Sequence, residues 1–230
     1  MMSKRIFYHP HNFLMFALLV LILAVAIAWL FIGTLGTAFE RVGFSSTTTA
    51  VILIATFLGS AINIPLLKIK TVNPIVRDRF VSFFGIVYRI PQTEYGETTT
   101  FLAVNVGGAL IPTIVSMYLL WKVPSDITYA LIDVAVVALV THLVARPVRG
   151  VGVVSPVLIS PLVAAVTAYL LLFKAPQIVA YVGGVLGTLI GGDLSNLHVI
   201  HKLGAPVASI GGAGTFDGVF LSGIIAVLLA

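Results

Sequence analysis

Three aspartates lie within or next to apolar segments of this sequence, where an ionised side chain is costly. Asp133 lies in TYALIDVAVV, Asp193 in IGGDLSN and Asp217 in GGAGTFDGVF. An ionisable group at mid-membrane depth usually faces a partner, a water-filled cavity or a functional site. No lysine or arginine falls inside these apolar segments. We therefore expect these carboxyl groups to be protonated or to contact water, backbone or a metal. Two of them close together could share a proton, as the carboxylates of an aspartyl dyad do.

Small and polar residues accompany the aspartates. The predicted substrate- or ion-binding residues are Asn105, Asn196, Gly191, Gly192 and Thr215. His198 and His201 follow Asp193 closely, and imidazole with carboxylate suits zinc. The sequence lacks an HExxH motif, which would supply a general base beside two histidine ligands. We therefore predict no cofactor and no metal site, with these two histidines as the alternative metal ligands.

The composition is that of a membrane protein. Hydrophobic residues make up 59% of the 230 residues, charged residues only 9%, and the mean hydropathy is +1.13. Soluble domains carry roughly 25% charged residues, so the main solvent of this chain is predicted to be the lipid bilayer. The net charge of +5 comes from basic residues between apolar segments, which argues against a nucleic-acid partner. The absence of cysteine excludes disulfides and thiolate chemistry.

Apolar segments of spanning length divide the chain. A transmembrane helix needs about 20 apolar residues, and the hydropathy pattern predicts seven spans, at roughly 13–38, 45–66, 100–121, 125–145, 153–173, 176–192 and 206–229. We read the first as a retained helix because a signal peptide has a shorter apolar core. The predicted fold is an all-α bundle of about seven transmembrane helices, forming one polytopic domain over residues 1–230.

The basic residues predict the orientation. With these spans, ten of the 13 lysines and arginines fall on the side of the N-terminus. The positive-inside rule then places the N-terminus inside and the C-terminus outside. The long inner loop, about 67–99, contains FVSFFGIVYRI at 80–90, which is too short to span. We expect it to form a short extended or hairpin element, or to lie at the membrane interface.

Glycine spacing predicts which helices are interior. Gly183, Gly187 and Gly191 recur every fourth residue in the sixth span, and Gly214, Gly218 and Ser222 do so in the seventh. Small residues at this spacing let helix backbones approach closely in lipid. The sixth and seventh spans are therefore predicted to pack inside the bundle. The pair Gly191–Gly192 also makes a helix break before Asp193 plausible.

Two resemblances follow from these motifs. IGGDLSN resembles the GxGD motif of intramembrane aspartyl proteases, the presenilin, signal-peptide-peptidase and prepilin-peptidase group, although the first glycine of GxGD is absent. The resemblance implies Asp193 as one catalytic carboxylate and Asp133 as the natural second, whereas depth along the helices favours pairing Asp133 with Asp217. The segments NVGGALIPTIVS, IGGDLSNLH and SIGGAGTFDGVFLSGIIAVLLA are similar to a family of uncharacterised archaeal and bacterial seven-helix membrane proteins.

Two functions of different class remain open. One is an aspartyl intramembrane protease-like protein, either active on a membrane peptide or catalytically degenerate. The other is an ion- or proton-coupled transporter or channel that uses glycine-broken helices and buried aspartates to hold an ion or small solute. Both place a multi-pass protein in the cell membrane, and both allow a homo-oligomer.

Overall fold

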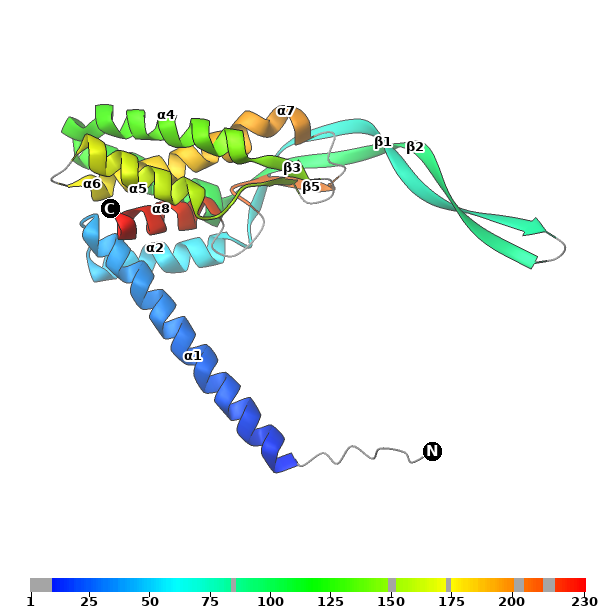
Figure 1. Cartoon of the computed structure of the whole chain (residues 1–230), viewed down its shortest axis with the longest axis horizontal. Coiled ribbons are helices and arrows are strands. Elements are labelled where there is room, and N and C mark those ends of the chain that lie inside the picture. The colour runs from blue at the N-terminus through cyan, green and yellow to red at the C-terminus, as the bar shows by residue number, and fades with distance from the viewer. Residues whose placement is uncertain (1–9, 84–85, 149–151, 173–174, 201–204, 213–217) are drawn as a thin grey trace.

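The computed structural model describes residues 10–83, 86–148, 152–172, 175–200, 205–212 and 218–230. This part of the chain is mostly helical. The expectation of an all-α protein is wrong in one respect, because a long β-hairpin and several short strands stand at one end of the helical bundle (Figure 1). The described residues contain three helices long and apolar enough to cross a membrane: Leu14–Arg41, Pro124–Val144 and Pro176–Ile200.

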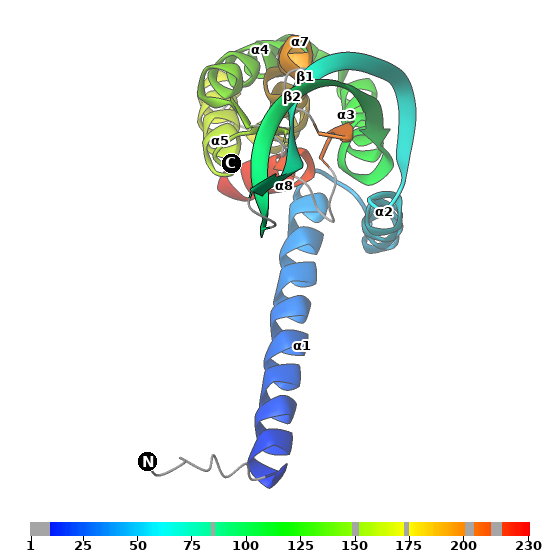
Figure 2. The same ribbon diagram turned by 90° about the vertical axis from the view of Figure 1, so that its right-hand side faces the viewer.

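Helix α1, Pro10–Arg41, leaves the bundle for most of its length (Figures 1 and 2). Its residues from Leu14 to Thr34 are exposed, while Leu35 and Phe39 near its C-terminal end are buried in the bundle. Arg41, in the last turn, donates to the backbone carbonyl of Leu228 at 3.1 Å. The helix is therefore anchored by its last two turns only, and its apolar remainder is suited to a lipid environment.

Helix α2, Ser46–Gly59, begins at an N-cap, Ser45, whose side chain accepts from the Thr48 N–H. It ends earlier than the predicted span, because strand β1 runs from Asn63 to Phe83. Strand β2, Ile86–Asn105, pairs antiparallel with β1 along its whole length. Prolines disfavour helix in this region, and β-branched and aromatic residues favour strand. The predicted short hairpin at 80–90 is therefore only the far end of a much longer one.

The third and fourth helical segments follow the hairpin. A π-helical turn η1, Val106–Leu110, leads into α3, Ile111–Lys122. The predicted span from residue 100 thus begins too early, because residues 100–105 still belong to β2. After the 3₁₀ turn η2, Pro124–Asp126, helix α4 spans Ile127–Val144, close to its predicted bounds.

The last third of the chain alternates short strands with helices. Strands β3, Arg146–Val148, and β4, Gly152–Val154, form a two-stranded sheet before helix α5, Ile159–Leu171. The predicted fifth and seventh spans were therefore too long, because each begins with a strand. The seventh begins with β5, Val207–Ile210, which pairs parallel with β2 and completes a sheet of order β1-β2-β5. Helix α8, Gly218–Leu229, ends the chain.

The core lies where α8 and the sixth helical segment meet the end of α1. Phe39, Tyr181 and Phe220 are almost fully buried there, with ring centroids 6.0 Å apart for Phe39–Tyr181 and 6.3 Å for Phe39–Phe220. The sixth and seventh helical segments are rich in buried residues, which confirms that they are interior. The hairpin, β3 and β5 lie at one end of the bundle, and the C-terminus lies at the other (Figure 1).

Candidate functional site

The sixth helical segment is irregular along most of its length. Helix α6, Pro176–Val182, continues into two π-helical turns, η3 (Gly183–Gly187) and η4 (Leu189–Asp193). A 3₁₀ turn η5, Leu194–Asn196, and the short helix α7, Leu197–Ile200, then follow. Wide π turns are rare and are found frequently at functional sites. The predicted break near Gly191–Gly192 is not present, because the segment stays helical from Pro176 to Ile200 and widens into π turns up to Asp193.

The glycines of this segment allow close packing against α4. A Cβ atom on Gly183 would collide with the Asp133 carboxyl group, and one on Gly191 would collide with the Ala138 carbonyl oxygen. The residue numbers of these contacts increase together in the two segments, so α4 and the η3–η4 segment run parallel. Ten residues separate Gly183 from Asp193, which at the α-helical rise corresponds to a distance on the order of 15 Å. The structure therefore does not bring Asp133 and Asp193 together.

Asp133 is enclosed in the bundle. Its side chain has no solvent exposure, and neither carboxyl oxygen has a hydrogen-bond partner among the residues that the structure describes. It lies against Gly183, the first residue of η3, so no other side chain fits between the two helices at this level. Buried polar groups without partners are uncommon in proteins and require an explanation. Asp133 is thus a buried polar group that forms no hydrogen bond within the described part of the fold.

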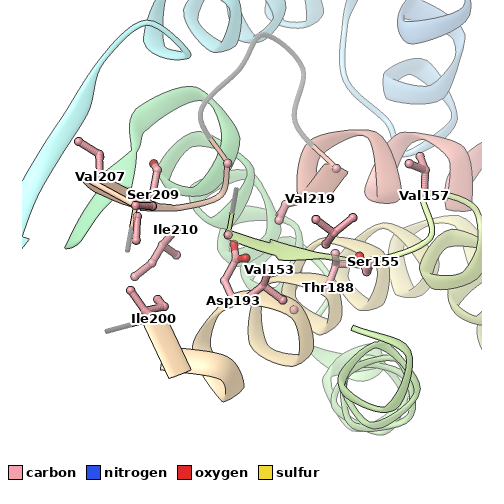
Figure 3. Close-up of a pocket in the computed structure, with 17 residues that line it drawn as sticks. Val153, Ser155, Val157, Thr188, Asp193, Ile200, Val207, Ser209, Ile210 and Val219 are labelled. Atoms are coloured by element: carbon pink, nitrogen blue, oxygen red, sulfur yellow. The ribbon is translucent and has the colours of Figure 1, made fainter. Parts of the chain in front are cut away.

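Asp193 lies in a different place, at the wall of a cavity at the strand-bearing end of the bundle. The cavity has a volume of about 320 Å³. The Gly211 N–H donates to Asp193 Oδ2 at 2.6 Å, which ties the carboxylate to the end of β5. Figure 3 shows Asp193 with Ile210 on one side and Val153 on the other. Asp193 is half-buried, so water can reach a carboxylate that the backbone also holds in place.

Strands border this cavity on two sides. All three residues of β4 and all four residues of β5 line it, together with the first turn of α8 and Thr188 from the junction of η3 and η4. Strand β5 is the last strand of its sheet, and β4 pairs with β3 on one side only in the described part of the chain. In the described part of the chain, each of these two cavity-lining strands therefore has one edge without a partner strand. Such edges are ready to pair with another extended chain.

Polar groups near Asp193 mainly hold the irregular helix. The Asn196 amide donates to the carbonyls of Gly191 at 3.2 Å and Gly192 at 2.8 Å. The Ser195 hydroxyl donates to the Gly191 carbonyl at 2.6 Å and lies 2.9 Å from His142 Nδ1 on α4. Wide helical turns leave carbonyl groups without their usual N–H partners. Asn196 and Ser195 satisfy these carbonyls, and His142 links them to α4.

Asn105 has a similar supporting role at the base of the hairpin. Its Oδ1 accepts from the Gly108 N–H at 2.7 Å and caps η1, while its Nδ2 donates to the Ser60 carbonyl at 2.8 Å. The Asn63 side chain links this amide to Ser209 of β5, whose hydroxyl donates to Asn63 Oδ1 at 2.6 Å. Asn105 therefore helps to hold β5, and with it the cavity wall, against the hairpin.

Three predicted site residues lie outside the described part of the chain: Asp217, Thr215 and His201. Gly218, which follows Asp217 in the sequence, lines the same cavity as Asp193. His198 is described, and its Nδ1 lies 3.1 Å from the Ser195 carbonyl oxygen. Among the described residues, no three side chains of the kinds that hold metals gather at one point.

Sequence reasoning missed the strands that form the cavity wall. Val207–Ile210 and Gly152–Val154 were assigned to the starts of spans, because both are apolar and precede long apolar segments. The sequence contains local signals for the boundaries of these strands. Pro206 precedes β5, and Gly211 and Gly212 follow it with φ of 78° and 74°, values that favour glycine and end the strand. Gly152, with φ of 130°, marks the start of β4 in the same way.

Comparison with known proteins identifies a family but no assigned activity. No curated protein and no solved structure matches the chain significantly. The family described as protein of unknown function (DUF1614) matches residues 57–229, which include the hairpin, the helices α3 to α8 and the Asp193 cavity. The protein is thus a membrane protein by its apolar helices, and it belongs to the DUF1614 family.

Proposed function

We propose that this chain is a multi-pass protein of the cell membrane with seven spans, its hairpin inside and its C-terminus outside. The distribution of basic residues supports this orientation. Arg41 contacts the end of α8, and Lys122 Nζ donates to the Gly43 carbonyl, so both belong to the end of the bundle that holds the C-terminus. The opposite end carries Arg146 in β3 and the five basic residues of the hairpin, Lys68, Lys70, Arg77, Arg79 and Arg89. An excess of positive charge is typical of the cytoplasmic side.

Within this frame, we propose that the Asp193 cavity binds an extended peptide and that the protein is related in mechanism to aspartyl intramembrane proteases. One observation carries this proposal: the Asp193 carboxylate lies in a cavity lined by β4 and β5, and each of these strands has one edge without a partner strand among the described residues. A peptide that adds a strand to such an edge gains main-chain hydrogen bonds, and its side chains enter neighbouring pockets. The mostly aliphatic lining favours a peptide with small or branched apolar side chains.

Hydrolysis of a peptide bond at this site needs a second carboxylate. We propose Asp217 for this role, since Gly218 beside it lines the cavity. One carboxylate accepts a proton from a water molecule, whose oxygen attacks the peptide carbonyl carbon. The other carboxyl group donates its proton to the carbonyl oxygen. When the C–N bond of this tetrahedral adduct breaks, the nitrogen accepts the proton that the first carboxylate took from water. The second carboxylate takes back a hydroxyl proton of the adduct, and the products are a carboxylic acid and an amine.

A transition-state mimic tests this proposal. The probe is an apolar peptide that carries a secondary hydroxyl in place of the scissile carbonyl, together with a photoreactive group. In proteoliposomes, we expect the wild-type protein to be labelled, and labelling to fall at least about tenfold in Asp193→Asn and Asp217→Asn, as expected when a charge-assisted hydrogen bond is lost. Asp126→Asn is the control, because Asp126 lies at the other end of α4 and contacts Ser125. Equal labelling of Asp193→Asn and the wild type would show the proposal to be wrong.

A second candidate function is ion- or proton-coupled transport, and the state of Asp133 favours it. A buried carboxyl group without hydrogen-bond partners, beside a π-helical turn of the central segment, is typical of groups that carry a proton or bind an ion in membrane proteins. We expect a voltage applied across proteoliposomes loaded with a pH-sensitive dye to drive proton uptake if this candidate is correct. Uptake should then be lost in Asp133→Asn and kept in Asp193→Asn. No uptake above that of protein-free liposomes would exclude proton transport.

A further inference from the structure

The far end of the β-hairpin has apolar side chains that the bundle does not cover. Phe80, Ile86, Val87, Tyr88 and Ile90 are between 49% and 68% exposed. Figure 1 shows this end of the hairpin well away from the helices. The residues 77–92 that contain them are named the hairpin tip here. Exposed apolar patches of this kind usually mark a surface that binds something.

The apolar side chains of the hairpin tip lie on both faces of the ribbon. The register pairs Phe80 with Arg89 and Ser82 with Val87, so Phe80 and Val87 share one face. The pairing of Phe83 with Ile86 and of Val81 with Tyr88 places Ile86 and Tyr88 on the other face, since side chains alternate along a strand. A hairpin docked on a protein surface buries one face and leaves the other in water. Apolar groups on both faces fit an environment that surrounds the ribbon, as the interfacial region of a bilayer does.

Basic residues neighbour these apolar side chains in the hairpin tip. Between residues 77 and 92 the sequence holds three arginines and one aspartate. Arg89 pairs with Asp78, and the exposed Arg79 donates to Gln92 Oε1 at 3.4 Å. Aromatic side chains with neighbouring arginines are typical of segments at the level of lipid headgroups. Positive charge at this position is complementary to anionic headgroups.

We propose that the hairpin tip docks on the surface of the bilayer that holds the bundle and that anionic phospholipids strengthen this contact. The hairpin leaves the bundle on the end where the cavity lies. The register shifts between Pro65 and Leu67, and such a bulge bends a strand. The pairing of β2 with β5 at Phe101–Val104 holds the root of the hairpin against the bundle. From Lys70 and Thr99 to the tip, β1 and β2 pair with each other in the described part of the chain. A bend in this two-stranded part brings the tip to the membrane, about 50 Å from the root at the strand rise per residue.

Single-cysteine labelling tests this inference directly, because the chain contains no cysteine. An environment-sensitive dye is attached to Val87→Cys at the tip and, as the matched control, to the exposed Glu97→Cys halfway along the hairpin. In proteoliposomes with phosphatidylglycerol, we expect a blue-shifted spectrum and quenching by spin-labelled lipids at position 87 but not at position 97. Adding Arg79→Gln to the Val87→Cys protein should lower the docked fraction about fivefold, the loss expected for one basic residue near an anionic surface.

Two outcomes would overturn the inference. A dye at position 87 that stays solvent-like in vesicles with and without phosphatidylglycerol means that the tip does not reach the bilayer. In the second outcome, spin-labelled lipids do not quench the dye, and a pyrene dye at position 87 shows excimer fluorescence. The tip then contacts a second copy of the chain instead of the bilayer. The test is independent of the Asp193 cavity, so failure of the proposed peptide-binding function leaves it unaffected.

Discussion

Replacing Gly191 with alanine is expected to lower the thermal stability of the protein strongly, whereas the same change at Gly192 is expected to have little effect. A Cβ on Gly191 would collide with the Ala138 carbonyl oxygen and lie 2.9 Å from the Ala138 Cα. Backbone atoms of a packed helix cannot rotate away as a flexible side chain can. The helices α4 and η4 must therefore separate, and such overpacking costs typically about 1–3 kcal/mol.

Gly192 is the matched control because it is the next residue in the same π turn. The nearest atom to a Cβ there is Thr141 Cγ2 at 3.7 Å, an ordinary van der Waals contact. In detergent solution, we expect the apparent melting temperature to fall by roughly 3–10 °C for Gly191→Ala and by less than about 2 °C for Gly192→Ala. Similar losses for both variants would mean that α4 and η4 are not packed as described. Both glycines were predicted to bind a substrate or ion, and the structure explains Gly191 by packing.

Filling the Asp193 cavity from Gly218 is expected to abolish binding of the hydroxyl-containing peptide while leaving the fold intact. Gly218 lines the cavity at the start of α8, and no atom lies within 4 Å of a Cβ built on it. A side chain can therefore leave the backbone at Gly218 without a collision at its Cβ, and we expect a leucine side chain to occupy space in the cavity. Because a leucine side chain takes up a large part of such a cavity, we expect photolabelling to fall about tenfold or more.

Gly33→Leu is the control for this variant. Gly33 also has no atom within 4 Å of a built Cβ, but it lies on the exposed part of α1, far from the cavity. We expect both variants to keep the wild-type melting temperature, and only Gly218→Leu to lose labelling. Full labelling of Gly218→Leu, with its melting temperature unchanged, would place the peptide somewhere other than this cavity.

Hydropathy predicts the presence of the helical segments in this chain better than the residues at which they begin and end. Each predicted span contains an apolar helix, but only three of the described helices are long and apolar enough to cross a membrane. The ends were wrong where apolar residues continue into strands, as at Val207–Ile210. In a membrane protein, a strand that lines a cavity and a helix that faces lipid are both apolar. Periodicity therefore does not separate them, and only the prolines and glycines at their boundaries do.

The relation between the aspartates depended on helix packing, which one sequence does not reveal. The contacts of α4 with η3–η4 agree with the prediction that these two segments run in parallel. Asp193 lies in the cavity that β4 and β5 line, away from Asp133. The GxGD resemblance nevertheless favours Asp133 as the partner of Asp193. Such a motif does not show which residues of two neighbouring helices face each other, and the structure places Gly183 beside Asp133. The orphaned carboxyl group of Asp133 is a property of packing that only coordinates show.

The most direct measurement of the central claim is the position of the photolabel on the wild-type chain. The hydroxyl-containing peptide is cross-linked in proteoliposomes, and the modified residues are identified by mass spectrometry. A peptide that lies between the strand edges beside Asp193 should label β4 and β5, at residues 152–154 and 207–210. Labels confined to the lipid-facing sides of α1 or α4, with none on either strand, would contradict the assignment of the Asp193 cavity as a peptide-binding site.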